Sequence, residues 1–141
     1  MRKRTMRVLI STGHLGTAPS SPDSFRRGME TDPDYVVADA GSSDPGPVYL
    51  GEDMQLGLFA REELELFLTA SRQRGIPLII GSAGDSGSNR AVDLFSGMIK
   101  EIAGQHRIPR FKVGHFYSEV AKSFLKQRLA RGAQLAGLGG F

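Results

Sequence analysis

Cysteine and tryptophan are both absent from this chain of 141 residues. Without cysteine, the chain can form no disulfide, no thiolate metal site and no cysteine nucleophile. Long hydrophobic runs are missing too, because the longest apolar stretches are far too short to span a bilayer. The basic N-terminus leads only into Val8-Leu9-Ile10, which is too short for the hydrophobic region of a secretory signal. We therefore expect a cytoplasmic protein with no membrane partner.

The chain also lacks a strong excess of charge. Its 18 Lys and Arg residues outnumber its 15 Asp and Glu residues only slightly, which gives a formal net charge of +3. The basic residues concentrate near the two ends of the chain, without a nucleic-acid reader motif and without interleaved exposed aromatics. Solvated termini and a solvated helix face explain this excess, so we expect no nucleic-acid partner.

What the chain does contain is a threefold pattern of a short apolar run followed by a polar loop with glycine. Such runs are typical of buried parallel strands. Glycine at the end of a strand lets backbone N–H groups approach a ligand closely. The three runs are Val8-Leu9-Ile10, Tyr35-Val36-Val37-Ala38 and Leu78-Ile79-Ile80.

Helical and strand patterns alternate along the sequence. We predict strands over residues 6–11, 35–39, 77–81 and 111–116, and helices over residues 22–29, 61–74, 89–104 and 118–131. This alternation predicts one α/β domain over residues 1–141. The expected form is a three-layer sandwich of Rossmann or flavodoxin type, with a small, mainly parallel sheet.

The predicted sheet has about four strands in the order 2-1-3-4. In such a sheet a ligand binds beyond the carboxyl ends of strands 1 and 3, where the winding reverses. Four strands make a small sheet, so we also expect a homo-oligomer, or a second subunit or domain that covers its far side.

The polar loops supply the candidate site residues. Glycine N–H groups, serine hydroxyls and the positive ends of helices can together hold a phosphate or carboxylate. For any single glycine, a tight turn between strand and helix is an equally good explanation. We predict catalytic roles for Asp39, His14 and Asp85, and ligand binding by Gly13, Gly16, Ser42, Ser43, Asp44, Gly81, Ser82, Gly84 and Ser86.

Asp39 is the strongest candidate, because a buried carboxylate at the end of a strand needs a partner. Together with Asp44 and Asp85 it can bind Mg²⁺, hold a substrate hydroxyl or act as a general base. Asp44 has an alternative role in a turn before proline, and Asp85 has one as a helix cap. His14 is a candidate proton-transfer group, whereas we expect His115 to pack in the core or support another group. No P-loop, dinucleotide-binding or nucleophile-elbow motif is present.

Two longer blocks of sequence resemble the acyclic terpene utilisation (AtuA) family. Residues 33–51 read PDYVVADAGSSDPGPVYLG, and residues 75–84 read GIPLIIGSAG. Similar family members read D-A-G-S-T-D-P-G-P-x-Y-L-G and G-I-P-L-I-I-G-S-A-G. The resemblance extends over roughly residues 6–131 and implies the N-terminal part of a longer protein that acts in the catabolism of acyclic terpenoids or similar acyl compounds. It supplies no catalytic mechanism, but its motifs include Asp39, Asp44, Gly81 and Gly84.

We therefore expect a domain that binds an anionic organic acid or an acyl-CoA, with a CoA thioester or Mg²⁺ as the candidate cofactor. Two alternatives stay open: a non-catalytic module that binds a nucleotide or CoA, and a structural subunit that works with a second chain. The sequence predicts neither the substrate nor the reaction, and it leaves open whether the domain is an enzyme.

Overall fold

The computed structural model describes residues 5–15, 21–41, 60–84 and 88–134. Three strands and four helices lie within these ranges, so the chain has the mixed α/β character that the sequence predicts. In chain order the elements are β1 (Val8–His14), α1 (Pro22–Glu30), β2 (Tyr35–Asp39), α3 (Ala60–Arg74), β3 (Leu78–Gly81), α4 (Asn89–Gln105) and α5 (Lys122–Ala130).

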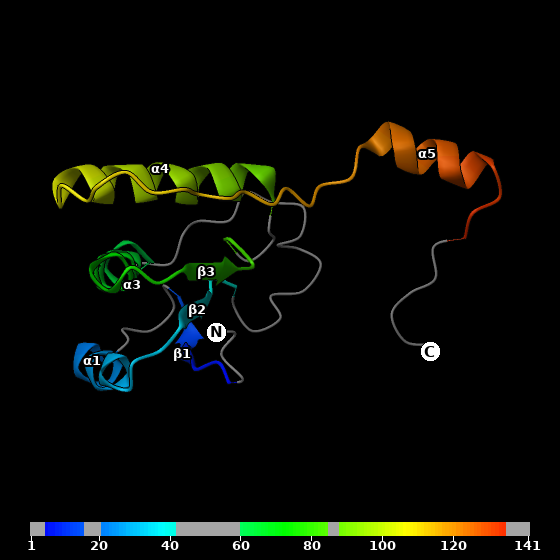
Figure 1. Cartoon of the computed structure of the whole chain (residues 1–141). Coiled ribbons are helices and arrows are strands. Elements are labelled where there is room, and N and C mark those ends of the chain that lie inside the picture. The colour runs from blue at the N-terminus through cyan, green and yellow to red at the C-terminus, as the bar shows by residue number, and fades with distance from the viewer. Residues whose placement is uncertain (1–4, 16–20, 42–59, 85–87, 135–141) are drawn as a thin grey trace.

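The strands form one parallel sheet in the order β1-β2-β3 (Figure 1). This differs from the predicted order 2-1-3-4, because β2 lies between β1 and β3. Val36 and Ala38 of β2 are only 0% and 1% exposed, as expected for a central strand, whereas Leu9 of β1, the register partner of Val36, is only partly buried. Both crossovers run in one direction, so the described sheet has no point where the winding reverses.

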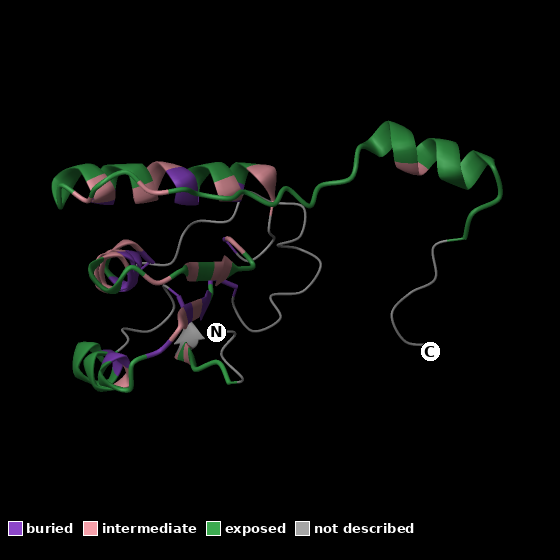
Figure 2. Ribbon diagram, viewed as in Figure 1, coloured by how far each residue is buried: buried purple, intermediate pink, exposed green. Residues whose placement is uncertain are grey.

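Helices α1 and α3 cover the same face of the sheet (Figures 1 and 2). Helix α1 begins at the N-cap Ser21, whose hydroxyl oxygen accepts a hydrogen bond from the Ser24 N–H at 3.3 Å. Phe25 of α1 contacts Phe67 of α3, with ring centroids 4.7 Å apart. Phe67 and its neighbour Leu64 are 1% and 0% exposed, so α3 forms the centre of the hydrophobic core.

Helix α4 packs beside α3, next to β3. Its Phe95 and Ile102 belong to the same buried cluster as the side chains of α1 and α3. At the surface, Arg61 Nη1 lies 2.8 Å from Glu101 Oε2 and links the two helices. Within the described ranges no helix packs on the opposite face of the sheet, so the predicted three-layer sandwich is not formed there.

An extended segment follows α4 and leads to α5, which projects away from the rest of the molecule (Figure 1). The predicted fourth strand, residues 111–116, lies in this segment but pairs with no strand. Its residues are largely exposed, so it lacks the burial that drives strand pairing in a parallel sheet. None of the helices described has the length and apolar character needed to cross a membrane.

Candidate functional site

The carboxyl ends of the three strands bring together part of the predicted site. His14 is the register partner of Asp39, and Asp39 is the register partner of Gly81. Backbone hydrogen bonds hold these ends side by side: Leu15 N donates to Asp39 O at 2.7 Å, and Ala40 N donates to Gly81 O at 2.9 Å. Three segments far apart in the sequence therefore meet at one edge of the sheet, as parallel strands require.

Asp39 is exposed, which makes the prediction of a buried carboxylate wrong. Its Oδ1 accepts a hydrogen bond from the Gly41 N–H at 2.9 Å, an arrangement typical of a turn at the end of a strand. The strand ends at a sheet edge that solvent reaches, so the carboxylate needs no buried partner. One accepted hydrogen bond leaves acceptor capacity on this side chain, and its catalytic role stays a prediction.

Gly84 has a clear structural role in the loop after β3. Its φ is +63°, and a Cβ at this position would lie only 2.8 Å from the Ala91 Cβ. Glycine is thus required for the loop to pass the start of α4, where Ser88 Oγ caps the helix by accepting from Ala91 N at 3.2 Å. Ser82 also has a positive φ, +49°. The tight-turn explanation therefore applies to Gly84, and its ligand-binding role stays a prediction.

Several predicted site residues cannot be placed in this way. Gly13 and His14 are described only by their backbone positions in β1. Among the residues that the structure describes, no three His, Asp or Glu side chains are arranged to hold a metal ion. The predicted residues that lie outside the described ranges are Gly16, Ser42, Ser43, Asp44, Asp85 and Ser86.

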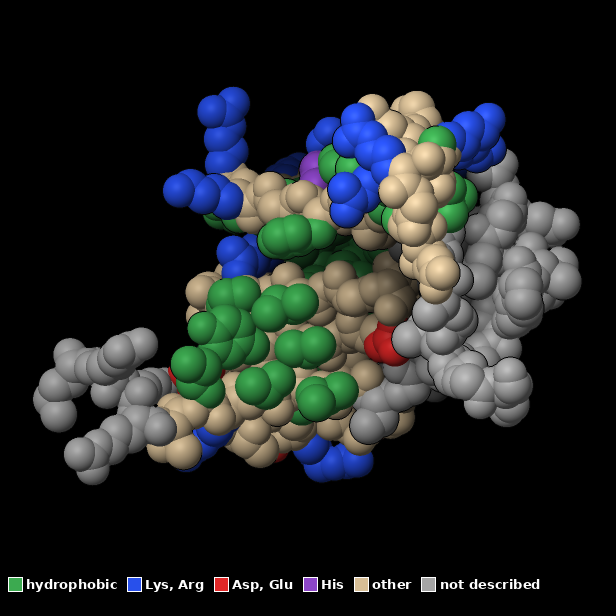
Figure 3. Space-filling model, turned by 90° about the vertical axis from the view of Figure 1, so that its right-hand side faces the viewer, with side chains coloured by type: hydrophobic (Ala, Val, Ile, Leu, Met, Phe, Trp, Pro, Cys, Tyr) green, Lys and Arg blue, Asp and Glu red, His purple; other side chains and the backbone are tan. Residues whose placement is uncertain are grey.

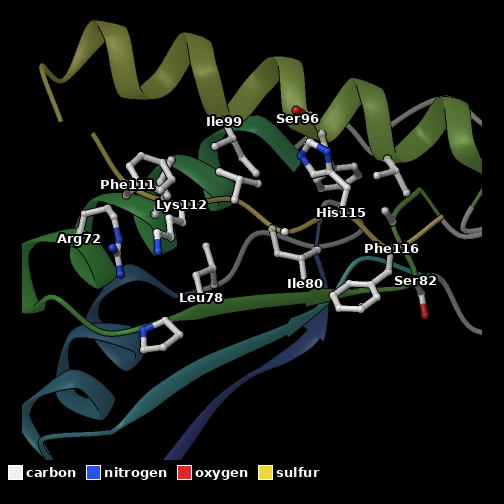
Figure 4. Close-up of a pocket in the computed structure, with 18 of the residues that line it drawn as sticks. Arg72, Leu78, Ile80, Ser82, Ser96, Ile99, Phe111, Lys112, His115 and Phe116 are labelled. Carbon is white, nitrogen blue, oxygen red and sulfur yellow. The ribbon is translucent and has the colours of Figure 1, made fainter. Parts of the chain in front are cut away.

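A cavity of about 970 Å³ lies between α4, β3 and the extended residues 110–118 (Figure 4). Leu78 and Ile80 of β3 point into it from one side, and Ile99 of α4 points into it from the other. Apolar walls of this kind are typical of sites that bind small organic molecules. The cavity reaches the loop after β3, where Gly81 and Ser82 line it.

Among the described residues, the charged side chains that line this cavity are all basic. Arg72, Arg110 and Lys112 line it together with His115, and no described Asp or Glu does. Figure 4 shows Arg72 and Lys112 at one end of the cavity, and Ser82 and Phe116 at the other. Across the described ranges, no acidic side chain pairs with Arg110 or Lys112. The cavity thus combines apolar walls with positive charge that is available to an anion.

Arg72 fastens one end of the extended segment to α3. Its Nη2 donates a hydrogen bond to the Ile76 carbonyl oxygen, which fixes the side chain at the end of its helix. Its guanidinium carbon lies 5.4 Å from the centroid of the Phe111 ring, a favourable cation–π distance. Arg72 therefore holds the segment in place and contributes positive charge to the cavity.

Two contacts fasten the other end of the segment to α4. The Tyr117 hydroxyl donates to Asp93 Oδ1 at 2.6 Å, and Glu119 Oε1 accepts from the Asn89 N–H at 2.8 Å. A carboxylate at the first turn of α4 also complements the positive end of that helix. Fastened at both ends, residues 110–118 form one wall of the cavity.

The Tyr117 contact predicts a measurable effect at alkaline pH. The hydrogen bond to Asp93 raises the pKa of Tyr117 above its usual 10.0, and desolvation and the charge of Asp93 raise it further. Because the folded-state pKa is raised, the contact stabilises the fold fully below pH 10.0 and is lost as the pH rises through the higher value. The difference between the absorbance titrations of the wild-type protein and Tyr117→Phe isolates the ionisation of Tyr117, and its midpoint should lie above pH 10.0. A midpoint at or below pH 10.0 would exclude the contact.

Sequence reasoning missed the basic residues of the cavity. Arg72 faces water in the predicted amphipathic pattern of its helix, and His115 was expected in the core or in a supporting role, but both line the cavity and His115 is exposed. One signal was available: Arg110 and Lys112 alternate with Phe111 in an extended segment, which puts two basic side chains on one side.

Comparison with protein-family models, with curated proteins and with solved structures finds no match to this chain. The likeness to the acyclic terpene utilisation family therefore rests on its two blocks of sequence alone. The activity that this likeness implies stays a prediction.

Proposed function

We propose that this domain binds an amphipathic organic anion, a carboxylate or an acyl-CoA with a hydrocarbon chain, in the cavity beside β3. The observation that carries the proposal is an apolar cavity whose charged lining residues, among those that the structure describes, are all basic. The hydrocarbon chain packs against Leu78, Ile80 and Ile99, and each CH₂ group it buries contributes about 0.8 kcal/mol. The anionic group binds near Arg110 and Lys112, where charge-assisted hydrogen bonds are the strongest available.

The loop after β3 provides the second polar end of the proposed ligand site. Gly81 and Ser82 line the cavity at the end away from Arg72 and Lys112. Asp39 does not line the cavity. It alternates along β2 with the buried Val36 and Ala38, which face the helices, so it faces the opposite side of the sheet. This separation favours binding over direct catalysis by Asp39 on a ligand in the cavity.

We also propose a role in the catabolism of acyclic terpenoids or similar acyl compounds, because their branched hydrocarbon chains fit apolar walls. We propose a Rossmann-like fold as well, which the parallel sheet and its crossover helices support. We further propose a homo-oligomer, supported by the apolar face of the sheet that no described helix covers.

Calorimetry with matched probes tests the ligand proposal. Decanoate, decanol and acetate separate the contribution of the carboxylate from that of the chain. We expect decanoate to bind about tenfold more tightly than decanol, since one good charge contact contributes about 1.4 kcal/mol, and acetate to bind weakly. Added salt should weaken decanoate binding more than decanol binding.

Two outcomes would contradict the ligand proposal. Equal affinity for decanoate and decanol would rule out recognition of the anion. Absence of heat with both probes at two well-separated temperatures, for protein shown to be folded by circular dichroism, would rule out the cavity as the site. Tight binding of CoA without an acyl chain would instead favour a nucleotide-binding module.

A further inference from the structure

The wall of the cavity contains a buried hydroxyl that lacks a hydrogen-bond partner. Ser96 of α4 lines the cavity, is only 8% exposed, and forms no hydrogen bond with any residue that the structure describes. Buried hydroxyls in folded proteins nearly always have a partner, because a hydroxyl that loses its water without replacement costs free energy. The hydroxyl of Ser96 is therefore available to a polar atom of a ligand in the cavity.

The ring of His115 is a second polar group of this kind, and it comes from the extended segment on the other side of the cavity. Within the described ranges, its nitrogens form no hydrogen bond. In the view of Figure 4 the ring lies between Ser96 of α4 and Ile80 of β3. An edge contact with Tyr117 positions it, with ring centroids 6.1 Å apart and an angle of 73° between the planes. Tyr117 is fixed in turn by its hydrogen bond to Asp93.

These two groups lie away from the basic end of the cavity. Figure 4 shows Arg72 and Lys112 at one end, Ile99 in the middle, and Ser96 with His115 beyond it. Because an extended chain rises about 3.3 Å per residue, Lys112 and His115 lie on the order of 10 Å apart along their segment. Figure 3 shows a hollow with hydrophobic side chains between the level of the sheet and that of α4. The cavity thus has a basic end, apolar walls and a second polar end without Lys or Arg.

The chemistry of the second polar end favours a hydroxyl group over a second anion. A serine hydroxyl can both donate and accept a hydrogen bond, and so can a neutral imidazole. A ligand hydroxyl, which also donates and accepts, fits this pair. A carboxylate would lose its water there without a Lys or Arg to compensate, whereas the basic end supplies that charge.

We propose that the ligand of this cavity is a hydrocarbon-chain acid with a hydroxyl group at the end far from its carboxylate, and that Ser96 and His115 bind this hydroxyl. The inference rests on the ligand proposed above and narrows it to the class of hydroxy acids. Ser96 and His115 then determine specificity, while Arg110 and Lys112 bind the carboxylate that all candidate acids share.

Calorimetry with three acids of equal chain length tests the proposal on the full chain. We expect 10-hydroxydecanoate to bind about fivefold more tightly than decanoate, which corresponds to one hydrogen bond of typical net strength. Decanedioate should bind less tightly than 10-hydroxydecanoate. The sign of the preference is decisive, because a hydroxyl buried without a partner would make 10-hydroxydecanoate the weaker ligand.

Two variants identify the groups that bind the hydroxyl. Ser96→Ala removes a hydroxyl that has no described partner, and His115→Phe keeps a ring beside Tyr117 at an exposed position, so both should fold. In each variant the ratio of the affinities for 10-hydroxydecanoate and decanoate should fall from about five towards one, because a hydrogen bond is lost. A general loss of structure would change both affinities and cancel in this ratio. Ser123→Ala is the matched control, since Ser123 is exposed on α5 and does not line the cavity; it should keep the wild-type ratio.

The outcomes separate this inference from the ligand proposal on which it rests. Wild-type protein that binds decanoate, but binds 10-hydroxydecanoate no more tightly, would overturn the inference and leave the ligand proposal in place. A preference that both variants retain would overturn it too, as would tighter binding of decanedioate than of 10-hydroxydecanoate. Absence of heat with all three acids at two well-separated temperatures would contradict the ligand proposal itself, and the inference with it.

Discussion

Replacing Phe67 with alanine should remove a large part of the stability of this protein. Phe67 is 1% exposed and contacts Phe25 of α1, so its ring connects two of the helices that cover the sheet. Truncation of a buried phenylalanine to alanine costs about 3–5 kcal/mol, through lost apolar burial and the cavity left behind. A domain of this size has a total stability of about 5–15 kcal/mol, so this loss is a large fraction of the free energy of unfolding.

Urea denaturation followed by circular dichroism measures this loss. The midpoint should fall sharply in Phe67→Ala, while the slope of the transition stays similar. Leu94→Ala is a suitable control, because Leu94 is 43% exposed and its truncation should change the free energy of unfolding by less than about 1 kcal/mol. A loss below about 1 kcal/mol in Phe67→Ala would contradict the central position of α3 in the core.

Most of the helices and strands could be predicted from the sequence because local chemistry determines where they begin and end. Ser21 and Pro22 mark the start of α1, and Gly75, with a φ of +68°, marks the end of α3. The predicted strand 35–39 has the same bounds as β2. Caps, prolines and glycines act within a few residues, so they can be recognised without knowledge of the rest of the fold.

The order of the strands could not be predicted from such local signals. Three apolar runs of similar length give no indication of which one lies in the centre. Only the packed structure shows that Val36 is fully buried while Leu9, its register partner on β1, is only partly buried. The predicted strand over residues 111–116 has the alternation of an edge strand and would pair with β3. In the structure the cavity lies between this segment and β3, so the two do not pair.

The candidate site could be predicted only in part for a related reason. Asp39 and Gly81 follow apolar strands, and the rule that parallel strands share a carboxyl edge is enough to bring them together. The basic end of the cavity combines Arg72 from α3 with Arg110 and Lys112 from a segment nearly forty positions later. Their local sequences give no sign that these three side chains lie close together. Their proximity arises only when α4 packs against α3 and beside β3.

Removing positive charge from the basic end of the cavity should weaken the binding of anions. The double variant Arg110→Gln with Lys112→Gln keeps long polar side chains at two exposed positions, so we expect it to fold normally. A charge-assisted hydrogen bond contributes about 1.5–3 kcal/mol when shielded from water and less when solvent screens it. Loss of these contacts should therefore raise the dissociation constant for decanoate about tenfold, to the value expected for decanol.

The uncharged probe and a charge-matched variant identify the cause of this loss. Affinity for decanol should stay the same in the double variant, because the apolar walls are unchanged, and the salt dependence of decanoate binding should flatten. Lys100→Gln with Lys126→Gln removes the same number of charges away from the cavity and should leave decanoate binding close to wild type. Equal weakening in both double variants would attribute binding to the overall charge of the protein, and the cavity would then have no specific role in recognising the anion.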